Sequence, residues 1–224
     1  MYVVERCRRF IQGALTSYGP TKIKKFIWDK MYSRGEWDFL DNTLGDCVYA
    51  HLEKHAKNGS ILDLGCGPGN TANELAATAY RTYLGVDISE PALEKARKRT
   101  MENGRAEKNS FAQGDFLSYV PPQQFDLILF RESMYHVPQG KIKMVLDRFA
   151  EYLKDDGVFV VRMFTSEGGK IKHRPVAMIN LIEAEFDIVE KAQYEEKGAT
   201  VIVFRPKARA KSVNLSSGVA ARPA

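Results

Sequence analysis

The chain of 224 residues is 44% hydrophobic, 11% aromatic and 27% charged, with a formal net charge of +5. Its length suits one domain with additional segments, and its composition excludes collagen-like, coiled-coil and disordered chains. No apolar run approaches the ~18–20 residues that a membrane helix needs, and the N-terminus lacks the apolar centre of a signal peptide, so we expect no membrane partner.

The positive charge lies at the two ends of the chain. Residues 1–25 carry six lysines and arginines against one acid, and residues 207–224 carry four and no acid, which leaves the intervening chain mildly acidic. A protein that grips nucleic acid is expected to show a basic face on its folded body. The charge distribution therefore gives little support to a nucleic-acid partner.

The cysteines and histidines predict neither a disulfide framework nor a metal site. Cys7, Cys47 and Cys66 are odd in number and never spaced as Cys-x-x-Cys, which indicates a reducing, cytoplasmic compartment. His51 and His55 lie four residues apart on an expected helix, a spacing that suits a metal. No third ligand is near them in sequence, so we expect solvent-facing histidines and no metal.

The expected elements follow two patterns along the chain. Residues 1–58 place apolar side chains at spacings of three and four, which predicts helices, with a loop at residues 28–37. From residue 59, short apolar runs alternate with helical stretches. The predicted strands are residues 61–64, 82–87, 110–112, 125–130, 157–163, 186–195 and 200–205, and the predicted helices between them are 71–79, 90–101, 139–153 and 175–184.

This alternation predicts an α/β fold: a doubly wound, mostly parallel sheet of seven strands with helices on both faces. The last two strands are joined by a short turn, so they should form a C-terminal hairpin with an antiparallel strand. Thr71 and Glu74 have the spacing of a capping box, and Ser89 can cap the next helix. We expect three segments: residues 1–58, a core at 59–206, and a disordered basic tail at 207–224.

The first predicted strand ends in a glycine-rich turn that indicates a nucleotide site. The segment Gly65–Gly69 follows Asp63 and has three alternating glycines, which allow the main chain to approach a ligand closely. Asp87, at the end of the second strand, can accept hydrogen bonds from both ribose hydroxyls. The dinucleotide pattern requires Gly or Ala where this chain has Asn70. An adenosine cofactor without pyrophosphate fits better, and a nicotinamide-binding or non-catalytic nucleotide module is the alternative.

These residues resemble the motifs of the class I S-adenosylmethionine-dependent methyltransferases. The resemblance spans about residues 58–206 and rests on residues 61–69, 85–87, 114–116 and 125–128. It implies a Rossmann-like methyltransferase that uses S-adenosylmethionine. It also implies that Asp63, Gly65, Cys66, Gly67 and Gly69 hold the methionine end, Asp87 the ribose, and Ile88, Asp115 and Phe116 the adenine, with Phe130 and Arg131 completing the cofactor-binding set.

The methyl acceptor is expected at residues 130–136, after the fourth strand. Members of this class that methylate amino groups of nucleic acids show a Pro-Pro-Tyr/Phe signature there, which this chain lacks, so a small-molecule acceptor methylated on N or O is favoured. His136 is the candidate base or acceptor-orienting residue, or else it braces the next helix. Glu132 can bind an amine or pair with Arg131, and Tyr135 can contact the acceptor or simply pack.

Residues 1–58 are expected to form a lid, as this region does in similar methyltransferases. Tyr32 and Trp37 offer aromatic faces that attract a sulfonium, and Arg34 can pair with the methionine carboxylate; alternatively, the aromatic side chains only pack. A basic loop at residues 164–176 can hold an acidic acceptor or remain solvated. An RNA or protein methyltransferase that uses the basic termini to hold its substrate is the second hypothesis for function.

Overall fold

The computed structural model of the protein describes residues 11–165 and 173–207. The strands are β1 (Gly59–Leu64), β2 (Tyr80–Asp87), β3 (Asn109–Gln113), β4 (Phe125–Arg131), β5 (Leu153–Phe164), β6 (Phe186–Tyr194) and β7 (Ala199–Pro206). The helices are α2 (Thr21–Ser33), α3 (Val48–Ala56), α4 (Asn70–Glu74), α5 (Glu90–Glu102), α6 (Ile142–Ala150) and α7 (His173–Glu185), preceded by helical residues 11–18. The expected tail beyond residue 207 and most of the expected basic loop lie outside the described residues.

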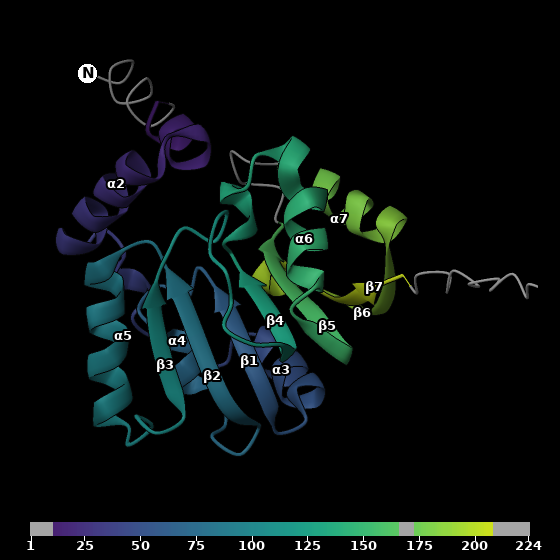
Figure 1. Ribbon diagram of the computed structural model, residues 1–224, viewed down its shortest axis with the longest axis horizontal. Helices are drawn as coiled ribbons and strands as arrows, with labels where there is room; N and C mark the ends of the chain where they lie inside the picture. The colour runs from purple at the N-terminus through teal and green to yellow at the C-terminus, as the bar shows by residue number, and fades with distance from the viewer. Residues whose placement is uncertain (1–10, 166–172, 208–224) are drawn as a thin grey trace, which may run out of the picture.

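The strands form one sheet in the order β3-β2-β1-β4-β5-β7-β6 (Figure 1). The neighbouring pairs from β3 to β5 are parallel, whereas β7 runs antiparallel to both β5 and β6. The predicted mostly parallel, seven-stranded sheet with a C-terminal hairpin is therefore confirmed. The strand order reverses between β1 and β4, and open α/β sheets bind ligands at the carboxyl ends of strands at such a point.

The central strands are buried on both faces, which explains their continuous apolar sequences. Along β4, Leu127 and Leu129 face one core while Ile128 and Phe130 face the other, and all four side chains are fully buried. Helices α3 and α4 cover the first face, and α6 and α7 cover the second. Because Cys47 and α3 pack into the sheet core, the part of the N-terminal region that lies beyond the sheet is residues 11–46, which we call the N-terminal segment.

Helix α4 is shorter than predicted. It ends at Glu74 rather than residue 79, because Leu75 adopts an extended conformation and is fully buried. The expected capping box is also wrong. The Glu74 carboxylate accepts hydrogen bonds from the main chain and hydroxyl of Thr43 and from the hydroxyl of Tyr49, so it ties α4 to the loop before α3.

Helix α2 includes residues 28–33, which the sequence predicted as a loop. Lys24, Trp28 and Tyr32 recur at four-residue spacing and share one face of the helix, and they line the cavity described below. Phe26 and Lys30 lie on the opposite face and are exposed. The helix lies at the carboxyl end of the strands, beside α5 (Figure 1). Within the described ranges, no helix has both the length and the apolar character to cross a bilayer.

Candidate active site

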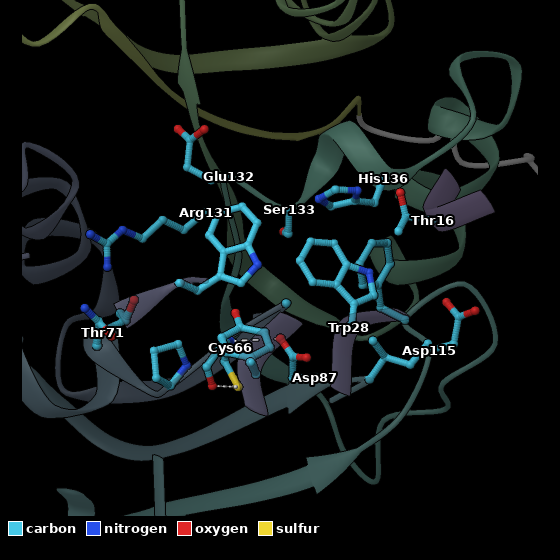
Figure 2. Close-up of a pocket in the computed structure, with 18 of the residues that line it drawn as sticks. Thr16, Trp28, Cys66, Thr71, Asp87, Asp115, Arg131, Glu132, Ser133 and His136 are labelled. Atoms are coloured by element: carbon cyan, nitrogen blue, oxygen red, sulfur yellow. Dashed lines mark hydrogen bonds between the residues drawn. The ribbon is translucent and has the colours of Figure 1, made fainter. Parts of the chain in front are cut away.

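A cavity of about 340 Å³ opens where the strand order reverses, between the sheet and the N-terminal segment (Figure 2). Its volume falls within the range of small-molecule sites, ~300–1,000 Å³. Of the predicted site residues, Tyr32, Trp37, Gly65, Cys66, Gly67, Asp87, Ile88, Asp115, Phe116, Arg131, Glu132 and His136 line it. Asp63, Gly69, Phe130, Tyr135 and Arg34 are not part of the lining, and Arg34 is exposed.

The glycine loop between β1 and α4 forms the floor of the cavity. Gly65, Gly67 and Gly69 have φ angles of +85°, +53° and +74°, in the left-handed region that favours glycine. A Cβ at Gly65 would lie 2.5 Å from the Cβ of Ser133, and one at Gly67 would lie 2.9 Å from the hydroxyl oxygen of Tyr32. Glycine is therefore required at these positions by both backbone conformation and space.

Asp87 ends β2 and is held by main-chain donors. The N–H groups of Gly67 and Ser89 each donate to its carboxylate at 2.9 Å. Its burial raises its pKa to about 6, while these hydrogen bonds oppose the shift. Ser89 precedes α5 as expected, but its hydroxyl makes no hydrogen bond to a described residue, so the predicted side-chain cap is wrong.

Asp63 lies beneath the glycine loop, with only 1% of its surface accessible. Its carboxylate accepts a hydrogen bond of 2.5 Å from the Tyr83 hydroxyl. Burial raises the pKa of Asp63 to about 6, opposed by the Tyr83 hydrogen bond and the charge of Arg131. A carboxylate in this environment favours a cation close to it.

An aromatic cluster from the N-terminal segment faces the loop. The rings of Trp28 and Trp37 are 5.7 Å apart, and those of Tyr32 and Trp37 are 6.4 Å apart. Trp28 also packs against His136 in an edge-to-face arrangement, with ring centroids 4.9 Å apart. Both side chains are labelled in Figure 2. The Trp37 Nε1–H is buried and has no acceptor among the described residues. Burial and the charge of Asp87 raise the pKa of Tyr32, so its phenol is neutral.

The wall beyond β4 and β5 is a network of alternating charges. Asp46 accepts a hydrogen bond of 2.8 Å from Arg131 Nη2 and lies 3.5 Å from Arg162 Nε. Arg162 in turn pairs with Glu132. The expected pairing of Glu132 with Arg131 is therefore wrong, because the side chain of Arg131 is held by Asp46 and by the hydroxyl of Tyr49.

Sequence reasoning missed three charged residues that line this cavity: Lys24, Asp46 and Arg162. Lys24 lies in a lysine-rich stretch, and Asp46 lies in a loop, so neither has a local signal. Arg162 does have one, because it is the single charge within the apolar residues 158–163 of a buried strand. Charged side chains in such strands require partners, and here the partners are Glu132 and Asp46.

His51 and His55 were expected to face solvent, and this expectation is wrong. Both point to β6, where Glu190 lies 3.1 Å from His51 Nδ1 and 2.8 Å from His55 Nε2. Burial lowers the pKa of His51. No cluster of three or more His, Cys, Asp or Glu side chains in the described ranges is placed to hold a metal ion.

Comparison with known proteins identifies the family. A methyltransferase domain profile matches residues 37–204. The chain therefore belongs to the methyltransferase domain family, and the resemblance to class I S-adenosylmethionine-dependent methyltransferases is confirmed.

Relatives and solved structures agree with this assignment. The chain is 30% identical over 141 residues to a probable thiol methyltransferase of Arabidopsis thaliana (61% of each chain), and 30% identical over 113 residues to a sterol 24-C-methyltransferase of Aspergillus fumigatus (50% of this chain, 29% of the relative). It thus spans less than two thirds of the length of these relatives. The N-methyltransferase NodS of Bradyrhizobium japonicum, solved with S-adenosylhomocysteine, has the same fold, with a TM-score of 0.63 at 18% identity over 80% of this chain and 98% of NodS.

Proposed function

We propose that this protein transfers a methyl group from S-adenosylmethionine to a nitrogen or oxygen atom of a small-molecule acceptor. The observation that carries the proposal is that one cavity joins the glycine loop, the carboxylate of Asp87 and an aromatic cluster. Family membership supports the reaction type. The names of the relatives include a thiol and a sterol methyltransferase, so the family leaves the acceptor open.

The chemistry of the cavity fits this cofactor. The N–H of Trp37, which has no acceptor among the residues that the structure describes, can donate to a carboxylate. The buried carboxylate of Asp63 lies under the loop, where an ammonium would be stabilised. The faces of Trp28 and Tyr32 suit a sulfonium, because a cation is attracted to an aromatic ring. Asp87 would accept hydrogen bonds from the ribose hydroxyls, as the resemblance implies.

The protein's main contribution is position. S-adenosylmethionine supplies an electrophilic methyl group on its sulfonium, so the chain must hold an acceptor atom in line with it. Positioning of this kind can supply ~7–11 kcal/mol. The rigid glycine loop and the network around Arg162 would hold the two sides of the reaction at fixed places, and the N-terminal segment would act as a lid that excludes water.

His136 is the residue proposed to orient the acceptor or to take its proton. It lines the cavity and packs edge-on against Trp28. Tyr135 is less suited to chemistry, because its hydroxyl accepts a 2.6 Å hydrogen bond from the Phe164 N–H and its pKa is raised by burial. We assign Tyr135 the role of joining the segment after β4 to the end of β5.

Titration calorimetry with S-adenosylmethionine, S-adenosylhomocysteine and NAD tests the cofactor. We expect the first two to bind and NAD not to bind; preferential binding of NAD would overturn the proposal. A panel of amine, phenol and thiol acceptors, read out as S-adenosylhomocysteine formed, tests the reaction. Methylation of tRNA or of a protein, lost at high salt, would replace the small-molecule acceptor with a macromolecule.

We also propose a cytoplasmic location. Cys47 and Cys66 are buried free thiols, as expected in a reducing compartment. Fractionation of cells that express the protein, with antibody detection, tests this location, and recovery of the protein outside the cytoplasm would contradict it.

A further inference from the structure

We infer that Glu132, fixed by Arg162 and Asp46, is an acceptor-recognition residue of this site in addition to His136, and that the acceptor therefore presents an N–H or O–H donor rather than a carboxylate. The inference rests on the proposed function and narrows its substrate class. It arises from three features of the wall beyond β4: where Glu132 points, how it is held, and which other charges surround it.

Glu132 is placed on the acceptor side of the cavity. Figure 2 shows its carboxylate directed away from Cys66 and Asp87, which mark the cofactor side. Of the four charged side chains in the wall it is the most accessible, at 36%, against 10–13% for Asp46, Arg131 and Arg162. It is thus the member of the network that a bound acceptor would meet.

The backbone of Glu132 is in a conformation that side chains rarely adopt. Its φ is +56°, one of three positive values at non-glycine residues in the described chain. Such a conformation is strained and persists only where surrounding contacts enforce it. Here the Glu132 N–H donates to the Arg162 carbonyl at 3.1 Å, while the Arg162 guanidinium holds the Glu132 carboxylate. Both ends of the residue are fixed by the same partner on β5.

Arg162 is fixed in turn from the N-terminal side. Asp46 lies 3.5 Å from its Nε, which is an ion-pair contact and not a hydrogen bond. Asp46 itself accepts hydrogen bonds from Arg131 at 2.8 Å and from the Val48 N–H at 3.0 Å. The charges of Arg131 and Asp46 therefore offset each other, and Arg162 is left to balance Glu132. Because every cation in this wall already has an anionic partner, an acceptor carboxylate would have to displace an acid. An amine or hydroxyl would instead add a donor to Glu132.

The groups that face Glu132 set its protonation. They are Arg162 of β5, Tyr135 of the turn after β4 and Asp46 of the loop before α3. Burial raises the pKa of Glu132, whereas the Arg162 charge and the Tyr135 hydroxyl lower it. Removing the Arg162 cation should therefore move the Glu132 pKa to higher pH. Arg162 acts through Glu132 and is a positioning residue.

The test uses two probes with the same ring, benzylamine and benzoate, and the protein saturated with S-adenosylhomocysteine. Saturation-transfer NMR gives the affinity of each probe. We expect benzylamine to bind about 10-fold more tightly than benzoate, and Glu132→Gln to reduce the difference to about 2-fold or less. Glu102→Gln changes an exposed acid outside the cavity and should leave the difference in affinity between the two probes unchanged. Equal affinities, tighter binding of benzoate, or binding of neither probe would overturn the inference.

The role of Arg162 is tested by lowering the pH and measuring the midpoint at which half of the benzylamine binding is lost, as Glu132 becomes protonated. Arg162→Met should move this midpoint up by about one pH unit, and Arg162→Lys should restore it to within about half a unit. A purely structural role would lower the melting temperature of Arg162→Met and leave the midpoint where it was. If S-adenosylhomocysteine itself fails to bind the wild-type protein, the proposed function fails, and that result is distinct from a failure of the probes.

Discussion

Lys24 of α2 and Asp115 of the loop after β3 form a buried ion pair across the cavity, with Nζ and Oδ2 3.1 Å apart and side-chain exposures of 8% and 7%. The hydroxyl of Thr21 donates to the same oxygen at 3.0 Å. Asp115 is the acid that the resemblance assigns to the adenine. The same carboxylate thus joins the N-terminal segment to the adenine side of the proposed site.

The first prediction is that Lys24→Met speeds the exchange of the cofactor. Breaking a buried pair by removing one partner costs about 3–5 kcal/mol, and part of this loss should appear as easier opening of the N-terminal segment. We expect S-adenosylhomocysteine to dissociate on the order of 10-fold faster, measured by stopped-flow tryptophan fluorescence. Lys25→Met removes the neighbouring, more exposed pair with Asp29 and serves as the control; equal dissociation rates in the two variants would refute the role of Lys24.

The second prediction concerns Asp87 and pH. Its folded pKa of about 6 lies above the ordinary value of 3.8, so the carboxylate that would accept the ribose hydroxyls is lost below about pH 6. The affinity for S-adenosylhomocysteine, measured by calorimetry, should fall between pH 7.5 and pH 5. Asp87→Asn should weaken binding at pH 7.5 by about 10-fold or more and flatten this dependence.

Protonation of Asp87 should not unfold the protein, so the expected loss of affinity at low pH does not come from unfolding caused by this group. A carboxyl whose pKa is higher in the folded than in the unfolded state stabilises the fold as it becomes protonated, between about pH 6 and pH 4. Asp63 has the same direction of shift, so Asp63→Asn should be measured beside Asp87→Asn. A pH profile that stays unchanged in Asp87→Asn would exclude Asp87 as the titrating group.

The third prediction separates backbone strain from contact at the glycine loop. Gly67 and Gly104 both have positive φ, +53° and +65°, but a Cβ at Gly67 would meet Tyr32, whereas nothing lies within 4 Å of one at Gly104. Alanine at either position should cost about 1–2 kcal/mol of stability from strain. Only Gly67→Ala should also weaken S-adenosylhomocysteine binding, measured by calorimetry. Equal affinities in the two variants would show that the loop does not contact the ligand.

The fourth prediction concerns Glu190, which joins β6 to α3. Hydrogen bonds from His55 and Lys54 lower its pKa to about 2. Glu190→Gln should reduce the free energy of unfolding by about 1–3 kcal/mol at pH 7, measured by urea denaturation. Because the folded pKa is depressed, this contribution is complete above about pH 4.5 and declines toward pH 2.

A matched control is available in an ion pair between α7 and the same strand, β6. Glu183 pairs with Lys191 at a more exposed site, where ion pairs are worth about 0–1 kcal/mol. Glu183→Gln should therefore change stability little. A stability loss in Glu190→Gln no larger than in Glu183→Gln would show that the histidine cluster does not fasten α3 to the sheet.

The sequence alone determined the sheet and the floor of the cavity. Residues 127–130 and 158–161 are apolar without interruption, which is the pattern of strands buried on both faces. The glycine loop and Asp87 were also evident, because they are local in sequence and each follows a strand. Helix α2 was misjudged at residues 28–33, since its aromatic side chains bury one face against a cavity that local spacing does not reveal.

The charged wall was decided by tertiary structure. Asp46, Arg131, Glu132 and Arg162 come from three separate stretches of chain, and their pairings depend on which side chains the fold brings within about 3–4 Å. Glu132 is the acid nearest to Arg131 in sequence, yet Glu132 pairs with Arg162 and not with Arg131. The reason is that adjacent residues at a strand end point in different directions. The spacing of apolar residues in the sequence indicates which faces of a strand or helix are buried. The partner of a charged side chain across the cavity depends instead on how the tertiary structure places distant segments.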